Sequence, residues 1–468
     1  MKLRTLFSMG VVGLLFLAAC NEDYPELEVS QSNEDKVESV VPAMSEDRSV
    51  VTKTNVDNII AKMRGNAKTR AAYSQDYTIQ ALNGKSGKPY AYVVNFKNNG
   101  GYVLISASKR YYPILAYSET GNFNIEHNIG ALKEWENTIN SEIEKSETLP
   151  MDSVRKYMMQ WGEYEPKTVP TTYRQSRSGS LPHDEFLELQ AVVMDSVMAW
   201  WTKGYEVYGI TDCPYLDETQ KEQLKEVIIG GMYPLYMDYW NEFTRIVKKE
   251  KVIRSNVDNF VYSTWDQNDG YNQFFPILSN GKRAFAGCGP VAAGQIMYYF
   301  RHPNTYNWDA MELHIPTTET ARLLYDIAEM ADANYKLDGT GTTIKKIKST
   351  FEKLGYSLQL ENDDFINPIM TSCDQRKPVF TIGFSNAGKG HAWVISGYHL
   401  EDVETYFEVW TFMRSNSFAV FDRMYPERVA YYNFYMNMGW GGLDNGYYYM
   451  PPTYINDREY LCNITPNR

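Results

Sequence analysis

Apolar and polar residues alternate in short segments within the first quarter of the chain, and this alternation predicts β-strands. One segment covers residues 90–96, and the next covers residues 102–106. Between them, residues 98–101 read Asn-Asn-Gly-Gly, which is typical of a hairpin turn because Asn and Gly tolerate positive φ angles. Another apolar segment follows at residues 114–118. The pattern predicts a small antiparallel sheet within residues 88–118.

Apolar residues spaced three or four apart continue the chain, and this spacing indicates helices. Three stripes show it: Leu132, Trp135, Ile139 and Ile143, then Phe186, Leu189, Val193, Val197 and Trp200, then Leu224, Ile228, Leu235 and Trp240. Such stripes are more often core than a cofactor site, so we predict a helical region over residues 129–252. Residues 174–180 interrupt it as a basic loop of small residues, and Lys248–Lys251 is predicted to be a charged hinge.

A nearly continuous apolar run at residues 291–300 predicts one buried helix. Residues 286–290 precede it and read Ala-Gly-Cys-Gly-Pro, which places Cys288 at the start of that helix. Pro290 suits the first helical turn, where its missing N–H costs nothing. A thiol at a helix N-terminus meets the positive end of the helix dipole, which favours the nucleophilic thiolate. Position alone also allows an inert core cysteine.

Two later segments supply the other groups that a cysteine nucleophile needs. Residues 388–398 place His391 at the mouth of an apolar strand, after a glycine-rich turn. Residues 437–442 read Asn-Met-Gly-Trp-Gly-Gly and precede a further strand. A Cys, a His and an Asn in this order can act as nucleophile, base and orienter. We therefore predict that His391 accepts the proton of Cys288 and that Asn437 fixes the ring of His391.

These segments resemble the streptopain family of papain-like cysteine peptidases, which bacteria make as zymogens. The matching runs are Gly287-Cys288, Gln295-Ile296-Met297, Gly390-His391-Ala392 and Gly439-Trp440-Gly441-Gly442. Met438 departs from the pattern, because the family usually has Trp there. Residues 265–272 resemble the Gln-containing segment of the family, which implies that Gln267 is an oxyanion-hole donor. Trp440 either shields the His–Asn contact from water or packs under the glycine-rich turn.

The resemblance implies an α+β fold with a papain-like catalytic domain over residues 253–468. A helical half would carry Cys288, and a twisted antiparallel sheet would carry His391 and Asn437. The strands described first lie within residues 55–128, which resemble the inhibitory propeptide of the family. The resemblance therefore implies a cysteine endopeptidase that is made as a self-inhibited zymogen and hydrolyses peptide bonds through a thioester.

The N-terminus has the pattern of an export signal. A short positive segment is followed by an apolar run at residues 6–17, which is too short to span a bilayer. Residues 17–20 read Leu-Ala-Ala-Cys and resemble a bacterial lipobox. We expect a lipoprotein signal peptide at residues 1–19 and a lipidated Cys20, although an ordinary secretory signal with an incidental cysteine is the alternative. Acid-rich residues 20–54 are predicted to be a flexible tether.

Composition and net charge limit the classes of molecule that the protein can bind. The net charge of −12 and the pI near 5.2 argue against nucleic acid. We expect protein or peptide substrates and no metal or cofactor. We also expect a lipoprotein at an outer or cell-surface membrane, and its release after processing stays open. Cys213, Cys373 and Cys462 form no CxxC pair, and one disulfide among them stays open.

Two functions of other classes also stay open. Met438 and the long helical region are compatible with an inactive relative that serves as a binding or inhibitor lipoprotein. A Cys-His-Asn acyltransferase or amidase is the other alternative, because thioester chemistry does not dictate the acceptor.

Overall fold

The structure is a computed structural model. It describes residues 49–68, 72–126, 130–149, 241–337, 339–361, 366–384, 390–413, 418–451 and 458–467, with a few isolated positions besides. For residues 241–254 and 405–427 the description covers the backbone alone. The signal segment with Cys20, most of the acidic tether, Cys213, the loop at 174–180 and the second and third helical stripes lie outside the described residues.

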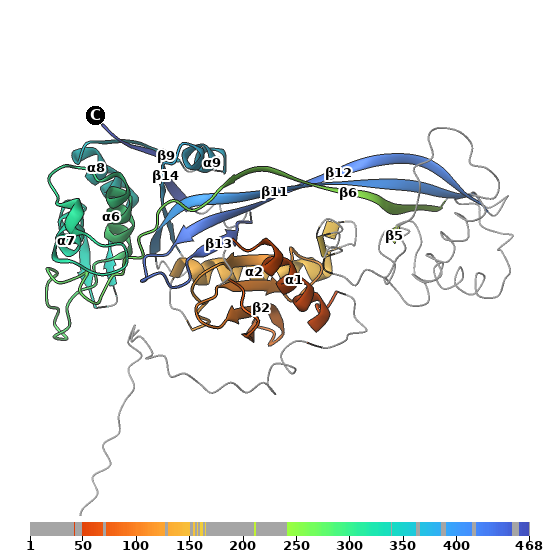
Figure 1. Ribbon diagram of the computed structural model, residues 1–468, viewed down its shortest axis with the longest axis horizontal. Coiled ribbons are helices and arrows are strands. Elements are labelled where there is room, and N and C mark those ends of the chain that lie inside the picture. Colours follow the sequence, from red (N-terminus) through yellow and green to blue (C-terminus); the bar gives the residue numbers. More distant parts are fainter. Residues whose placement is uncertain are drawn as a thin grey trace, which may run out of the picture.

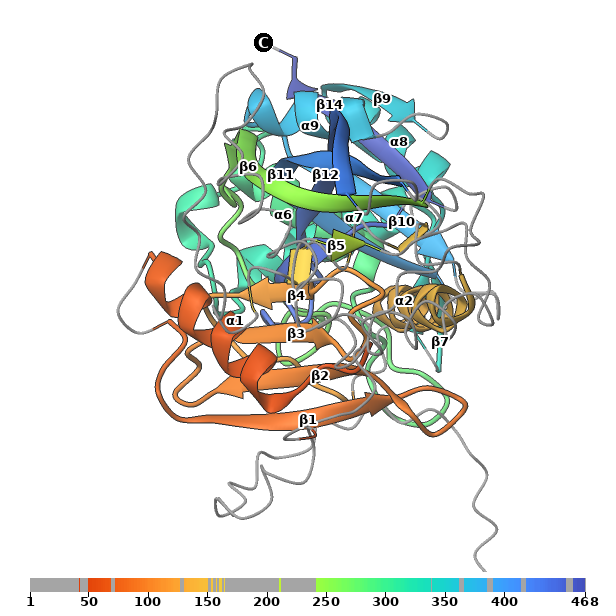
Figure 2. The ribbon, with the colours of Figure 1, turned by 90° about the vertical axis from the view of Figure 1, so that its right-hand side faces the viewer.

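The N-terminal part is a four-stranded sheet with two helices (Figures 1 and 2). Its elements are α1 (Lys53–Asn66), β1 (Tyr77–Asn83), β2 (Pro89–Phe96), β3 (Tyr102–Ser106), β4 (Ile114–Ser118) and α2 (Gly130–Thr148). The predicted strands at 90–96, 102–106 and 114–118 are confirmed. The predicted turn is confirmed as well, because Asn98 and Asn99 have φ angles of 62° and 54°.

The two faces of this sheet are buried against different partners, because side chains alternate along a strand. Tyr92 and Val94 of β2 pack in one apolar cluster with α1. Ala91 and Val93 belong to a second cluster, which also contains the predicted stripe of α2 and extends into the C-terminal part. The N-terminal sheet therefore shares a core with the rest of the molecule.

The C-terminal part combines helices with long antiparallel strands. Its helices are α6 (Cys288–Phe300), η2 (Trp308–Ala310), α7 (Thr318–Met330), α8 (Ile344–Lys353) and α9 (Ile366–Asp374). Its strands are β6 (Asn241–Val257), β7 (Asn334–Lys336), β8 (Gly339–Gly341), β9 (Tyr356–Glu361), β10 (Val379–Phe384), β11 (Gly390–Met413), β12 (Phe418–Asn437), β13 (Gly446–Tyr449) and β14 (Arg458–Pro466). This composition confirms the predicted α+β class. Helices α6, α7 and α8 gather at one end of the sheet (Figure 1).

One sheet runs through both parts of the molecule. Its main path is β1-β2-β3-β4-β13-β12-β11-β10-β14-β9, and the pairs along this path are antiparallel. The junction is the pairing of β4 with β13, in which Tyr117 lies opposite Tyr447 and Ala116 lies opposite Tyr448. The N-terminal sheet thus adds edge to edge to the strand that follows the Asn437 turn.

One prediction about the middle of the chain is wrong. Residues 241–252 are strand, not helix, and the predicted hinge at Lys248–Lys251 lies inside β6. β6 pairs with β11, and the short strand β5 (Ile210–Thr211) pairs with β6 from the other side. The β5 pairing reaches only residues 244 and 245, and the charged run beyond it is typical of a sheet edge, where Lys and Glu deter pairing with other molecules. Together β6, β11 and β12 form a long arm in Figure 1.

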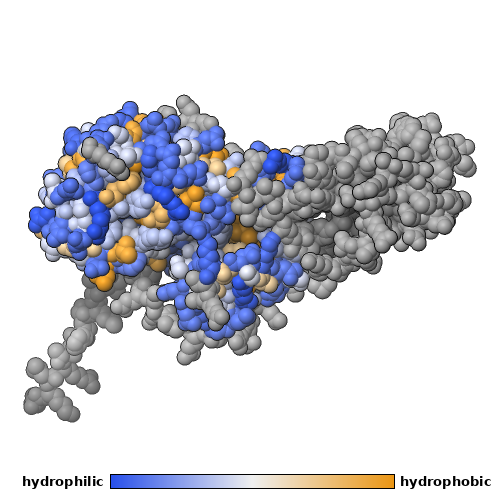
Figure 3. Space-filling view, turned by 45° about the horizontal axis from the view of Figure 1, so that its top comes forward, coloured by the Kyte–Doolittle hydropathy of each residue, from blue (hydrophilic) through white to orange (hydrophobic). Residues whose placement is uncertain are grey.

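The surface of the described part is mainly hydrophilic, with small apolar spots (Figure 3). The most exposed large apolar side chains are Tyr262, Ile277, Leu337 and Ile315. Within the part that the structure describes, no helix is both long and apolar enough to cross a membrane. Cys373 and Cys462 are buried thiols that form no disulfide with each other, and burial raises the pKa of both thiols, that of Cys462 to about 12.

Candidate active site

Cys288 is the first residue of α6, as predicted. The preceding Gly287 has a φ of 92°, and a Cβ atom there would lie 2.9 Å from the carbonyl oxygen of Thr340. Only glycine therefore fits this turn. Cys288 itself is half-buried, whereas the following residues up to Met297 are buried. The helix thus presents one accessible thiol at its positive end.

Gln267 lies beside the turn that leads to Cys288. Its carbonyl oxygen accepts a hydrogen bond of 2.8 Å from the backbone N–H of Ala286. Its side chain is 5% exposed, and its Nε2 atom has no hydrogen-bond partner among the residues that the structure describes. A buried amide donor without a protein acceptor is uncommon and calls for a ligand or water. This geometry suits the predicted donor to a substrate oxyanion.

His391 lies near the start of β11, the strand on which α6 packs. Its ring is 4% exposed, and its Nε2 atom lies 2.9 Å from the carbonyl oxygen of Met438. A carbonyl only accepts, so Nε2 carries the hydrogen and the neutral ring keeps its lone pair on Nδ1. Burial lowers the pKa of His391 to about 4, although the bond to Met438 opposes this shift. The ring is therefore neutral at pH 7 and can accept a proton at Nδ1.

The predicted contact between the Asn437 side chain and His391 is wrong. The carbonyl of Met438 accepts the hydrogen bond from Nε2 of His391, and the Asn437 side chain points toward the helical half. The amide of Asn437 donates to the carbonyl oxygen of Ser263 at 2.7 Å and accepts from the N–H of Gly439 at 3.2 Å. Asn437 therefore shapes the turn that holds the Met438 carbonyl and acts on His391 through the backbone.

Met438 and Trp440 complete the surroundings of the imidazole. The Met438 side chain is 1% exposed, and its backbone N–H donates to the side chain of Asn445 at 2.8 Å. The Trp440 ring lies 6.4 Å from the ring of His391 at an angle of 14°. Trp393 lies 6.2 Å from His391, also at 14°. Both indole rings are nearly parallel to the imidazole, so Trp440 lies beside His391 itself and not beside a His–Asn contact. The departure at Met438 leaves the orienting carbonyl in place.

Sequence reasoning missed two residues that join these pieces. Asn445 holds the Met438 N–H, and Gln295 links α6 to Asn437. A signal for Gln295 was present, because it is a lone amide within an otherwise apolar helix. No pattern pointed to the Met438 carbonyl, since every residue carries such a group.

Comparison with known families places both parts of the chain. Residues 51–143 match the model described as Spi protease inhibitor, and residues 265–306 and 304–448 match the Peptidase C10 family. A cysteine peptidase domain therefore follows an inhibitor-type N-terminal domain. Residues 265–448 thus match the peptidase C10 family, which is the streptopain family, and the predicted resemblance of this part of the chain is confirmed.

One curated relative and two solved structures are also similar to the chain. The chain is 23% identical over 227 residues to the thiol protease/hemagglutinin PrtT of Porphyromonas gingivalis. That match covers 40% of this chain and 23% of PrtT, so the chain spans about a quarter of that relative. A mutant prointerpain A fragment of Prevotella intermedia is 15% identical, with a TM-score of 0.43 and coverage of 82% of this chain and 98% of the fragment. Active interpain A of the same organism is 17% identical, with a TM-score of 0.33 and coverage of 45% and 95%.

Proposed function

We propose that this protein is an exported cysteine endopeptidase that is made as a self-inhibited zymogen. The observation that carries the proposal is the buried His391, whose Nε2–H is fixed by the Met438 carbonyl, on the strand against which the Cys288 helix packs. The match of residues 265–448 to the peptidase C10 family supports the same chemistry.

The reaction follows from the protonation state of the imidazole. Nδ1 of His391 accepts the proton of the Cys288 thiol, and the thiolate attacks the peptide carbonyl carbon. Gln267 and the Cys288 N–H stabilise the oxyanion, and losing one such donor typically costs about 10²–10³ in turnover. The imidazolium then protonates the leaving amine, and a thioester remains. Water, deprotonated by His391, hydrolyses this thioester and regenerates the thiol.

Latency has a physical basis in the contacts between the two parts. Three residues of the N-terminal part donate hydrogen bonds to the segment just after Met438. The N–H of Asn124 donates to Asp444 at 2.7 Å, the hydroxyl of Tyr102 to Asn445 at 3.2 Å, and the indole of Trp135 to Tyr449 at 2.8 Å. These bonds, with the β4–β13 pairing, hold the N-terminal part on the sheet that carries the imidazole.

The proposed function is tested with a vinyl-sulfone thiol probe and with casein. After limited proteolysis under reducing conditions, the protein should hydrolyse casein and carry the probe on Cys288, as located by peptide mass mapping. Absence of both would instead favour the binding or inhibitor lipoprotein. Transfer of the acyl group to an added amine in preference to water would identify an acyltransferase.

Membrane attachment through Cys20 is part of the proposal. Its support is the Leu-Ala-Ala-Cys run at residues 17–20, since lipidation of that cysteine would anchor the chain. Expressed with its leader in a bacterium, the protein should enter the detergent phase, and Cys20→Ser should shift it to the aqueous phase or stall its processing. An unmodified Cys20 after labelling with an alkyne fatty acid would contradict the anchor.

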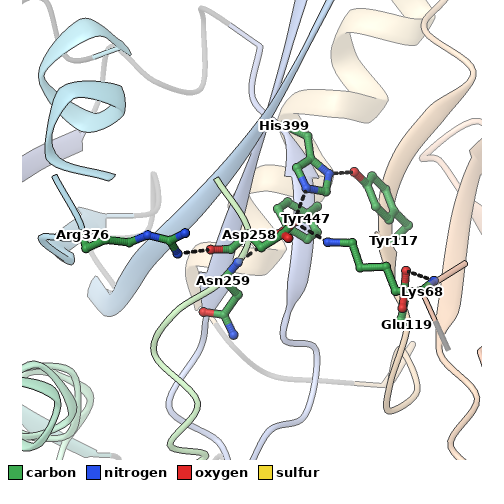
Figure 4. Close-up of polar contacts among 8 residues, drawn as sticks. All are labelled: Lys68, Tyr117, Glu119, Asp258, Asn259, Arg376, His399 and Tyr447. Atoms are coloured by element: carbon green, nitrogen blue, oxygen red, sulfur yellow. Dashed lines mark hydrogen bonds and ion pairs between the residues drawn. The ribbon is translucent and has the colours of Figure 1, made fainter. Parts of the chain in front are cut away.

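A cluster of titratable groups links the two parts beside β4 and β13 (Figure 4). The Tyr117 hydroxyl lies 2.5 Å from Nδ1 of His399, and Nε2 of His399 lies 3.2 Å from Asp258. Lys68 forms an ion pair with the same Asp258 carboxylate, and the Tyr447 ring stacks on His399 at 4.0 Å. Because the Asp258 carboxylate accepts the hydrogen bond from Nε2–H of neutral His399, Nδ1 of the same ring can accept a hydrogen bond from the Tyr117 hydroxyl.

This cluster predicts that mild acid loosens the zymogen. Burial lowers the pKa of His399, with Lys68 adding to this and Asp258 opposing it. When the parts separate, the His399 ring meets water and loses Lys68 but keeps Asp258, so its pKa rises toward the ordinary value near 6.5 and the separated state binds the proton more readily. The contribution of His399 is therefore complete above about pH 6.5 and is lost as the pH falls below it.

The measurement is the urea midpoint of tryptophan fluorescence at about pH 7.5 and about pH 5.5, in an inactive Cys288→Ala background. His399→Gln is the matched variant, because its amide can accept from Tyr117 and donate to Asp258 without titrating. Asp444 also titrates, since burial raises its pKa to about 7, but its effect has the opposite sign and is common to both proteins. An equal pH response of both proteins would contradict the prediction.

A further inference from the structure

Gln295 is a buried amide on the helix that carries Cys288. It follows Cys288 by seven residues, which is two helical turns, so both side chains lie on the same face of α6. Its side chain has no exposed surface, although the helix around it is apolar. Burying an amide is unfavourable unless its hydrogen bonds are made, so the hydrogen-bond partners of Gln295 indicate its role.

The carbonyl oxygen of this amide ties the helix to the segment that contains Gln267. Oε1 of Gln295 accepts from the Ser263 hydroxyl at 3.1 Å and from the backbone N–H of Trp265 at 3.3 Å. The same segment also binds the glycine-rich turn, because the carbonyl of Trp265 accepts from the N–H of Gly441 at 3.2 Å. These hydrogen bonds therefore fix the position of α6 along this segment, two helical turns after Cys288.

The other partner of Gln295 is Asn437, and the two amides bind each other reciprocally. Nε2 of Gln295 donates to Oδ1 of Asn437 at 3.3 Å, and Nδ2 of Asn437 donates to Oε1 of Gln295 at 3.1 Å. The orientation of each amide is determined by a backbone donor, Trp265 for Gln295 and Gly439 for Asn437. This pair connects the nucleophile helix to the turn whose Met438 carbonyl holds His391.

We infer that Gln295 is a positioning residue, which sets the register of the Cys288 helix against both the oxyanion-hole segment and the turn that orients His391. The inference rests on the proposed function and adds to it the group that keeps nucleophile, donor and base in register. A displacement of about 1 Å of one reacting group can cost about 10²-fold in rate, which is why a residue far from the substrate matters.

Gln295→Glu is the sharpest variant, because it keeps the shape and the acceptor oxygen. An ionised Glu cannot donate to Oδ1 of Asn437, whereas a protonated Glu can. Burial raises the pKa of a carboxyl group, so the acid form persists at low pH. We expect kcat to fall by about 10²-fold as the pH rises through that pKa, with KM within about threefold, and no such basic limb in the wild type.

Two further variants keep the test decisive. Ser263→Ala removes one donor to Gln295 without adding volume, and it should lower kcat several-fold at constant KM. Thr350→Val is the matched control, because Thr350 is a fully buried polar residue of α8 whose hydroxyl bonds to Lys346. It should lower the urea midpoint but leave kcat and its pH profile unchanged.

All proteins are full-length chains activated by the same limited proteolysis and assayed with a peptide substrate. Folded Gln295→Glu with wild-type kcat at every pH would overturn the inference, while leaving the proposed function intact. If Gln295→Glu does not fold, unchanged kcat in Ser263→Ala overturns it. A wild type that neither cleaves casein nor binds the vinyl-sulfone probe would remove the proposed function, and this inference with it.

Discussion

Cys288→Ala should abolish peptide hydrolysis, with a loss of turnover on the order of 10⁶-fold, as for other nucleophiles that act as a unit with their base. His391→Ala should lose nearly as much, because such groups are not additive. The fold should persist, since Cys288 is half-buried at a helix start and its replacement leaves no large cavity. The measurement is the initial rate on a fluorogenic peptide, together with the urea midpoint of each variant.

Cys373→Ala is the matched control for the loss of a thiol. Cys373 is fully buried, and burial raises its pKa, so it should neither react with the probe nor contribute to turnover. Its variant should keep full probe labelling at Cys288 and near wild-type rates. Hydrolysis that survives in Cys288→Ala but disappears in Cys373→Ala would place the nucleophile elsewhere and reject the site.

Tyr102→Phe should partly activate the uncleaved zymogen. The Tyr102 hydroxyl lies 3.1 Å from the hydroxyl of Tyr448 and bonds to the Asn445 carbonyl, so its loss removes this donor from a buried carbonyl of the catalytic part. Such a loss costs about 1–2 kcal/mol, which corresponds to an increase of about 5–30-fold in the separated fraction. The basal rate before any cleavage should rise by the same factor, as measured on a small peptide substrate while gels confirm an intact chain.

Tyr102→Phe should change the uncleaved zymogen but not the activated enzyme, because Tyr102 lies in the proposed inhibitory part. If maturation removes that part, the activated enzyme is identical in wild type and variant. Tyr92→Phe is the control, since Tyr92 lies in the same sheet but packs on the α1 side. It should lower stability without raising the basal rate. Equal latency in Tyr102→Phe and wild type would indicate that this hydrogen bond does not hold the zymogen closed.

Several elements could be predicted because their signals are local in the chain. The turn at 98–101 followed from Asn and Gly at positions that need positive φ, and the α6 helix followed from an unbroken apolar run behind a Gly-Cys-Gly-Pro start. Cys288 and His391 could be singled out for the same reason, because a nucleophile and a base are side chains in recognisable neighbourhoods. These features depend on residues that are close together in the chain.

Other features depend on pairing between distant segments and became visible only in the folded molecule. Residues 241–252 are strand because β11 pairs with them, and β4 completes the catalytic sheet because it meets β13. The group that orients His391 is the carbonyl of Met438, which no residue type can reveal. The partners of Asn437 and Gln295 were equally hidden, because an amide can bind many groups and only the packed fold selects among them.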